Sequence, residues 1–118
     1  MARVLTVDDS RAVRSIVVRQ LNEWGVETDE AEDGIKGLEK LDEVLYDLVL
    51  LDVTMPEMDG PTMLTELRQR GVDARVVFVS GYADDAFARN LPGKQEFVFL
   101  PKPFTLKQLV ETVKATMA

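Results

Sequence analysis

Side chains that could do chemistry follow several of the apolar stretches in this sequence. Asp8 and Asp9 come directly after RVLTV, and Asp52 ends the apolar run VLLD before a turn with two prolines and a glycine. Ser80 closes RVVFVS, and Lys102 follows EFVFLP. An aspartate at the buried end of an apolar stretch is costly unless it has a partner. We therefore take these five residues as the candidate functional site.

Three carboxylates gathered at one place would repel one another unless a cation lay among them. One lysine does not neutralise three carboxylates. Mg²⁺ would, since it typically takes one or two carboxylates, keeps several waters and joins phosphate oxygens; Mn²⁺ is the alternative ion. A carboxylate beside such an ion can act as a nucleophile and form an aspartyl-phosphate. The residue types thus predict a metal-dependent phosphoryl-transfer site, in which Ser80 and Lys102 contact phosphoryl oxygens.

Each candidate residue also has a simpler explanation. Asp8 and Asp9 could serve only to stabilise the positive end of a following helix. Ser80 precedes a glycine, as residues that open turns often do, and Lys102 between two prolines could be a solvated loop lysine. We favour a shared site because all of these residues fall at the ends of apolar stretches.

The apolar stretches have the character of buried strands. They do not alternate cleanly between apolar and polar residues, which suits strands covered on both faces of a parallel sheet. Strands are expected at 3–7, 47–53, 75–80 and 96–101, with a weaker edge strand at 26–31.

Helical patterns separate the expected strands. Ser10 can cap the first helix and Gly25 can stop it, whereas Gly34 and Gly37 weaken the second. The apolar faces of these two helices are expected to hold Val13, Ile16, Val17, Leu21 and Trp24, and Ile35, Leu38, Leu41 and Leu45.

The remaining helices are expected in the second half of the chain. A helix over 61–70 has Pro61 in its first turn and is closed by Gly71. A short fourth helix begins at Asp84, and Thr105 can cap the last one. That last helix spans 105–117, with an apolar stripe of Leu106, Leu109, Val110, Val113 and Met117.

Strand–helix alternation repeated five times predicts right-handed crossovers and a doubly wound α/β sheet. In such sheets the reactive groups collect at the carboxyl ends of the strands. The first, third, fourth and fifth strands end in the candidate residues, and the second offers none. The fold would therefore bring three carboxylates, one hydroxyl and one ammonium group to one edge of the sheet.

Length and composition exclude several classes of protein. The 118 residues fit a single domain over 1–118, and 46% hydrophobic with 30% charged residues is typical of a soluble globular protein. The net charge of −7 argues against a nucleic-acid partner. No segment approaches the roughly 20 apolar residues of a membrane span, and the N-terminus lacks a signal-peptide pattern. The absence of cysteine and histidine rules out thiol and histidine chemistry, and we expect a cytoplasmic location.

Four motifs together resemble the receiver domain of two-component response regulators, of the CheY-like type. They are VDDS at 7–10, LLDVTMPEMDG at 50–60, VSGYA at 79–83 and LPKPF at 100–104. The resemblance spans essentially the whole chain. It implies a (βα)5 sheet with the flavodoxin-like strand order 2-1-3-4-5.

The resemblance also implies a role for each matching residue. Asp52 would be the phosphoacceptor, with Mg²⁺ held by Asp8, Asp9, Asp52 and the backbone carbonyl of Thr54. Ser80 would be the switch hydroxyl, and Lys102 would pair with the phosphoryl group. The remaining roles are a cis peptide at Pro103, an aromatic switch residue at Phe99, and control of the phosphoryl lifetime by Thr54 and Tyr82. Gly81 departs from the alanine more usual in the family and is a tolerated small substitute.

As a receiver, the chain would take a phosphoryl group from a histidine kinase or a histidine phosphotransfer protein, hydrolyse it slowly, and switch a surface that binds a downstream protein. It would promote its own phosphorylation and dephosphorylation without being an enzyme in the usual sense. No nucleic-acid or membrane partner is expected.

Three other functions remain open from the sequence. A phosphatase of the haloacid-dehalogenase type would need an aspartate where Thr54 stands. A flavodoxin-like electron carrier would need a phosphate-binding loop where Asp8 and Asp9 would repel the flavin phosphate. A degenerate receiver could act only as a binding module, although the acidic set is complete.

The two parts of the chain resemble different receivers. Residues 1–70 resemble stand-alone CheY-type receivers, whereas 79–114 are similar to the receiver of hybrid histidine kinases of the CckA type. A natural subfamily with both features and a chimeric or engineered sequence would each account for this.

Overall fold

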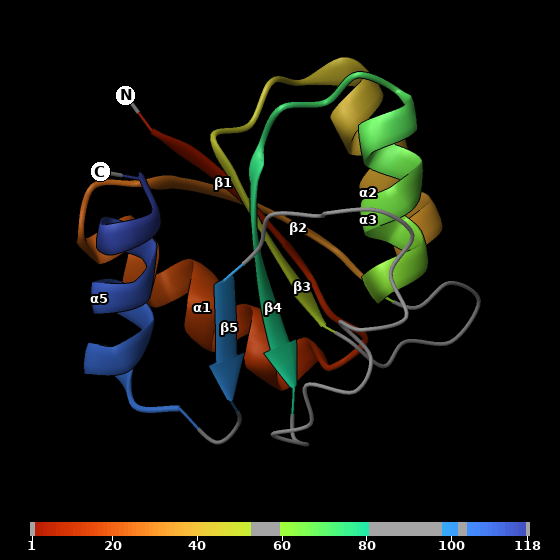
Figure 1. The fold of residues 1–118 in the computed structure, drawn as a ribbon. Coiled ribbons are helices and arrows are strands. Elements are labelled where there is room, and N and C mark those ends of the chain that lie inside the picture. The colour runs from red at the N-terminus through yellow and green to blue at the C-terminus, as the bar shows by residue number, and fades with distance from the viewer. Residues whose placement is uncertain (1, 53–59, 81–97, 102–103, 118) are drawn as a thin grey trace.

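A five-stranded parallel sheet forms the centre of the molecule (Figure 1). The computed structural model of the chain describes residues 2–52, 60–80, 98–101 and 104–117. The strands are β1 (Arg3–Val7), β2 (Glu27–Ala31), β3 (Leu48–Asp52), β4 (Arg75–Ser80) and β5 (Val98–Pro101). Their order is β2-β1-β3-β4-β5, with every neighbouring pair parallel, which confirms the predicted doubly wound sheet and its strand order.

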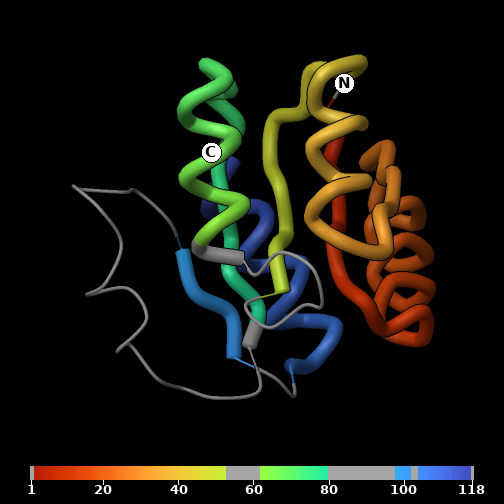
Figure 2. The backbone as a smooth tube through the Cα atoms, turned by 90° about the vertical axis from the view of Figure 1, so that its right-hand side faces the viewer, coloured from red at the N-terminus to blue at the C-terminus, as the bar shows by residue number. Residues whose placement is uncertain are grey.

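Helices cover both faces of the sheet (Figures 1 and 2). They are α1 (Arg11–Glu23), α2 (Gly34–Glu43), α3 (Gly60–Gln69) and α5 (Leu106–Met117). In Figure 1, α1 and α5 lie on one side of the sheet and α2 and α3 on the other. The short helix predicted to begin at Asp84 falls outside the described residues. None of the helices in the described ranges is long and apolar enough to cross a membrane.

The central strands β1, β3 and β4 are largely apolar on both faces, as predicted, because each face packs against helices, whereas the edge strand β2 is polar. Successive residues of β3 alternate between the two layers: Val49 and Leu51 pack with α2 and α3, and Leu48 and Leu50 pack with α1 and α5. Phe78 in β4 is fully buried in the first layer. Two separate hydrophobic layers therefore hold the sheet and fix the positions of its strand ends.

The predicted helix caps are present. The Ser10 hydroxyl accepts a hydrogen bond from the Val13 N–H at 3.3 Å. Thr105 and Gln108 bond reciprocally at the start of α5, where the Gln108 N–H donates to the Thr105 hydroxyl at 3.0 Å and the Thr105 N–H donates to the Gln108 side chain at 2.8 Å. Such a capping box satisfies two backbone donors. Gly25 follows α1 with φ of 88°, a conformation that favours glycine.

Gly37 has a packing role that the sequence did not indicate. A Cβ added there would lie 2.7 Å from the Met63 Cε and 3.0 Å from the Val7 Cγ2. Glycine lowers helix propensity, but here its small size lets α2 approach β1 and α3 closely. This close contact fixes α2 against the sheet.

Four of the apolar residues assigned to the helix faces are exposed in the structure, which the sequence did not indicate. Ile16, Ile35 and Leu106 are 50%, 45% and 47% exposed. Each lies at the margin of its helix's apolar stripe, and only the centre of the stripe contacts the sheet. Leu45 is 94% exposed because α2 ends at Glu43, two residues earlier.

Candidate metal centre

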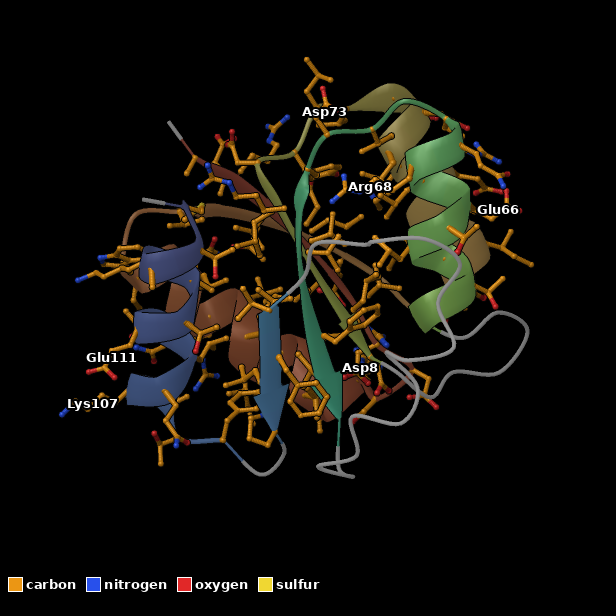
Figure 3. All side chains as sticks on the ribbon, viewed as in Figure 1. Asp8, Glu66, Arg68, Asp73, Lys107 and Glu111 are labelled. Carbon is orange, nitrogen blue, oxygen red and sulfur yellow. The ribbon has the colours of Figure 1, made fainter. Side chains whose placement is uncertain are left out.

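The register of the sheet places Asp8 beside Asp52. Val7, the last residue of β1, pairs with Leu51 of β3. The next residue of each chain segment is an aspartate, so the two carboxylates leave neighbouring strands at the same level. Figure 3 shows Asp8 at the lower edge of the sheet, at the carboxyl ends of the strands.

The same register continues across the sheet toward β5. Asp52 pairs with Val79, and the following residue, Ser80, pairs with Pro101. The backbone of Ser80 therefore stands at the predicted edge, one strand away from Asp52. The side chain of Ser80 lies outside the described part of the structure.

Asp8, Asp9 and Asp52 form a cluster of carboxylates. One oxygen from each lies within 4.8 Å of the others. Asp8 and Asp52 are 3% and 8% exposed, whereas Asp9 is exposed to solvent. The three residues that the sequence predicts to share a metal are thus brought together, two of them at the buried end of their strands.

The start of α1 orients the Asp8 carboxylate. The Ser10 N–H donates to the Asp8 Oδ1 at 2.8 Å, next to the point where Ser10 caps the helix. On the other side, the Asp8 N–H donates to the carbonyl of Ala31 at 3.2 Å. The simpler explanation of Asp8 as a helix-end carboxylate therefore holds as well, and it fixes the residue inside the cluster.

Apolar side chains lie beneath the carboxylates. Asp8 and Asp52 border a cavity of about 10 Å³, room for no more than roughly one water. The other lining residues include Val13, Val17, Leu50, Val79, Phe104 and Leu109. The buried side of the cluster is therefore nearly dry, and charges there interact more strongly than in water.

The cluster fits a hard divalent cation. Oxygens bound to one Mg²⁺, each about 2.1 Å from it, lie at most about 4.2 Å apart. The three carboxylate oxygens need only small side-chain rotations to reach that spacing from their separations of up to 4.8 Å. Carboxylates and water are also the ligands that Mg²⁺ and Mn²⁺ prefer.

The other predicted site residues are placed less fully. Phe99 lies in β5 beside Phe78 and is half-buried against the layer formed with α2 and α3. Thr54, Tyr82, Lys102 and Pro103 lie outside the described residues.

Sequence reasoning missed two residues that support the cluster. Arg14 of α1 is only 9% exposed and donates hydrogen bonds to the Asp8 carbonyl and to Glu30. Glu30 lies near the end of β2, the strand predicted to offer nothing to the site. The signal was the spacing of Arg14 from Val17 and Leu21, by three and seven residues, which places it on the buried face of α1.

The sequence matches the family described as response regulator receiver domain over residues 4–114. The chain belongs to this family. The receiver is 55% identical over 115 residues to the sensor kinase CckA of Brucella abortus, covering 96% of the chain and 12% of that kinase. A receiver domain is the phosphorylatable module of two-component signalling, so this is the functional class of the chain.

Solved structures agree with this assignment. The chemotaxis protein CheY4 of Vibrio cholerae superposes with a TM-score of 0.92 at 27% identity, covering 98% of each chain. The response regulator TrrA of Thermotoga maritima, in complex with Mg²⁺–BeF, gives a TM-score of 0.86 at 33% identity and covers 98% of this chain and 99% of that one. The family favours the receiver over the phosphatase and the electron carrier.

The similarity to CckA predicted for the C-terminal part of the receiver is confirmed. It also extends over almost the whole chain, so the segment that resembled stand-alone receivers is covered too. One receiver type therefore accounts for both parts, and a chimeric origin is not needed to explain the sequence.

Proposed function

We propose that Asp52 accepts a phosphoryl group from a phosphohistidine, on a histidine kinase or a histidine phosphotransfer protein, and that Asp8, Asp9 and Asp52 hold Mg²⁺ during the transfer. The observation that carries this proposal is the cluster itself, in which one oxygen of each carboxylate lies within 4.8 Å of the others. Thr54 would add its backbone carbonyl to the metal ligands.

The chemistry follows from the position of Asp52. A carboxylate oxygen of Asp52 forms the new bond to phosphorus while the bond from phosphorus to the donor histidine nitrogen breaks. When bound, Mg²⁺ supplies positive charge to the phosphoryl oxygens. Asp8 and Asp9 would hold that charge in place, and the apolar wall below Asp52 limits water on its buried side. Ser80 and Lys102 would contact the remaining phosphoryl oxygens.

TrrA supports this proposal, because its structure contains Mg²⁺ and BeF on a closely similar fold. Beryllofluoride stands in for the phosphoryl group of an aspartyl-phosphate. We infer the same use of the cluster here, with the receiver promoting its own phosphorylation and dephosphorylation. The cytoplasmic location, the extent of the receiver over 1–118 and the downstream partner stay predictions.

A phosphotransfer panel tests the donor. Autophosphorylated histidine kinases and phosphotransfer proteins, carrying a labelled phosphoryl group, are mixed briefly with the receiver. We expect strong preference for a few donors, because receivers discriminate among partners by surface contacts. If no phosphohistidine donor labels the chain, phosphotransfer is not its function.

Phosphorylation is expected to change the surface near Phe99. Phe99 lies beside Phe78, which is buried two residues before Ser80, so a shift at the end of β4 has a direct path through packed side chains. Amide chemical shifts measured with and without beryllofluoride should change at Phe99 and in α5 as well as around Asp52. Changes confined to the loops around Asp52 would contradict a switch of this kind, in which Ser80 and Pro103 also take part.

The phosphorylated state is expected to be long-lived. Hydrolysis needs a water in line with the breaking bond, and neither Thr54 nor Tyr82 is a strong base near neutral pH. Amide or acidic side chains at these positions could orient that water, so Tyr82→Glu and Thr54→Asn should speed phosphate loss several-fold. The measurement is a dephosphorylation time course. An unchanged or slower rate in Tyr82→Glu would show that Tyr82 does not shield the site.

A further inference from the structure

A buried cation lies directly behind the carboxylate cluster. The Arg14 side chain is 11% exposed, although arginine is seldom buried without partners. Its Nη1 donates to the backbone carbonyl of Asp8 at 2.6 Å, and its Nε donates to the Glu30 Oε1 at 2.8 Å. One guanidinium therefore joins α1, the segment after β1, and the end of β2.

These contacts complete the restraint of Asp8. Its N–H is bonded to the Ala31 carbonyl, its Oδ1 to the Ser10 N–H and its carbonyl to Arg14. The Asp8 carbonyl belongs to the peptide plane that leads into Asp9. Fixing that carbonyl thus fixes the direction in which both the Asp8 and Asp9 side chains leave the backbone.

We propose that Arg14 is a positioning residue for the divalent cation, acting through the Asp8–Asp9 peptide, and that Glu30 holds Arg14 in this position. The inference rests on the proposed metal site and adds the chain's own support for it. Removing outer partners of metal ligands typically weakens metal binding by about 10- to 100-fold.

The direction in which the Mg²⁺ affinity changes when Arg14 is removed distinguishes a positioning role from a purely electrostatic one. If Arg14 acted only through its charge, removing it would relieve repulsion of the incoming cation, and the affinity for Mg²⁺ would rise. If Arg14 only stabilised the fold, its removal would lower the melting temperature and leave the Kd for Mg²⁺ unchanged. A positioning role predicts weaker binding by a folded protein.

The experiment is a titration of Mg²⁺ followed by amide chemical shifts, with melting temperatures measured without metal. Arg14→Met keeps much of the apolar stem and removes both donors, and we expect its Kd to rise about 10- to 100-fold. Arg14→Lys keeps the positive charge but loses the two-donor geometry of the guanidinium group. Its Kd should lie between those of Arg14→Met and wild type. The matched control is Arg70→Met, which breaks the ion pair between Arg70, just after α3, and Asp42 of α2, and should leave the Kd unchanged.

Each outcome decides a different claim. If the amide chemical shifts of the wild type around Asp8 and Asp52 do not change with Mg²⁺, both the metal site and the positioning role of Arg14 are contradicted. If wild type binds Mg²⁺ and Arg14→Met binds it equally or more tightly, the positioning role alone is overturned. Should Arg14→Met fail to fold, Arg14→Lys decides, because a charge-only role leaves its Kd at the wild-type value.

Discussion

An Asp52→Asn protein is expected to accept no phosphoryl group from a phosphohistidine donor that labels the wild type. The amide lacks the anionic oxygen that attacks phosphorus, while its size and shape preserve the buried end of β3. Labelling at a saturating concentration of Mg²⁺, followed over time, should therefore fall to background.

Asp73→Asn is the matched control for this loss. Asp73 lies in the exposed loop before β4, at the opposite edge of the sheet from Asp8 (Figure 3). The same change of charge there should leave the labelling rate at the wild-type level. Labelling of Asp52→Asn at that level would place the acceptor on another residue.

Mg²⁺ is expected to stabilise the wild-type fold. A cation that binds only the native state adds about 2.7 kcal/mol to the free energy of unfolding at a hundredfold excess over its Kd. For a domain of this size that corresponds to several degrees in melting temperature. The reason is relief of the repulsion among three carboxylates that lie within 4.8 Å of one another.

Without metal, the Asp9→Asn variant should be more stable than the wild type. Removing the exposed member of the cluster relieves repulsion on the order of 1 kcal/mol, so the metal-free variant should melt at a higher temperature than wild type. Its response to Mg²⁺ should be much smaller, because a ligand is lost. Thermal unfolding with and without Mg²⁺ measures both effects, with Asp73→Asn again as control. If Mg²⁺ does not change the melting temperature of the wild type, the proposed metal site is contradicted.

Much of the fold could be predicted from the sequence because the strands are covered on both faces. Their apolar runs end abruptly, and the described strands β1 to β4 begin within one residue of the predicted positions. The grouping of Asp8, Asp9 and Asp52 followed from the rule that parallel strands end at one edge. Register, which a sequence does not give directly, then set the two buried carboxylates side by side.

The support behind the cluster could not be predicted in the same way. The burial of Arg14 depends on partners that the sequence does not reveal, because a charged side chain is rarely buried without them. These partners are a carbonyl six residues earlier and Glu30 on another strand. Likewise, the exposure of Ile16 depends on how much of α1 the sheet covers. Both are properties of packing between segments distant in the chain.

The most direct test of the central claim is the intact mass of the wild-type chain after incubation with a small donor such as acetyl phosphate. One sample contains Mg²⁺ and the other an excess of chelator. The carboxylate cluster predicts a single added phosphoryl group with Mg²⁺ and none with chelator, because Asp8 and Asp9 serve the reaction only by holding the ion. Full phosphorylation in chelator would contradict the metal site.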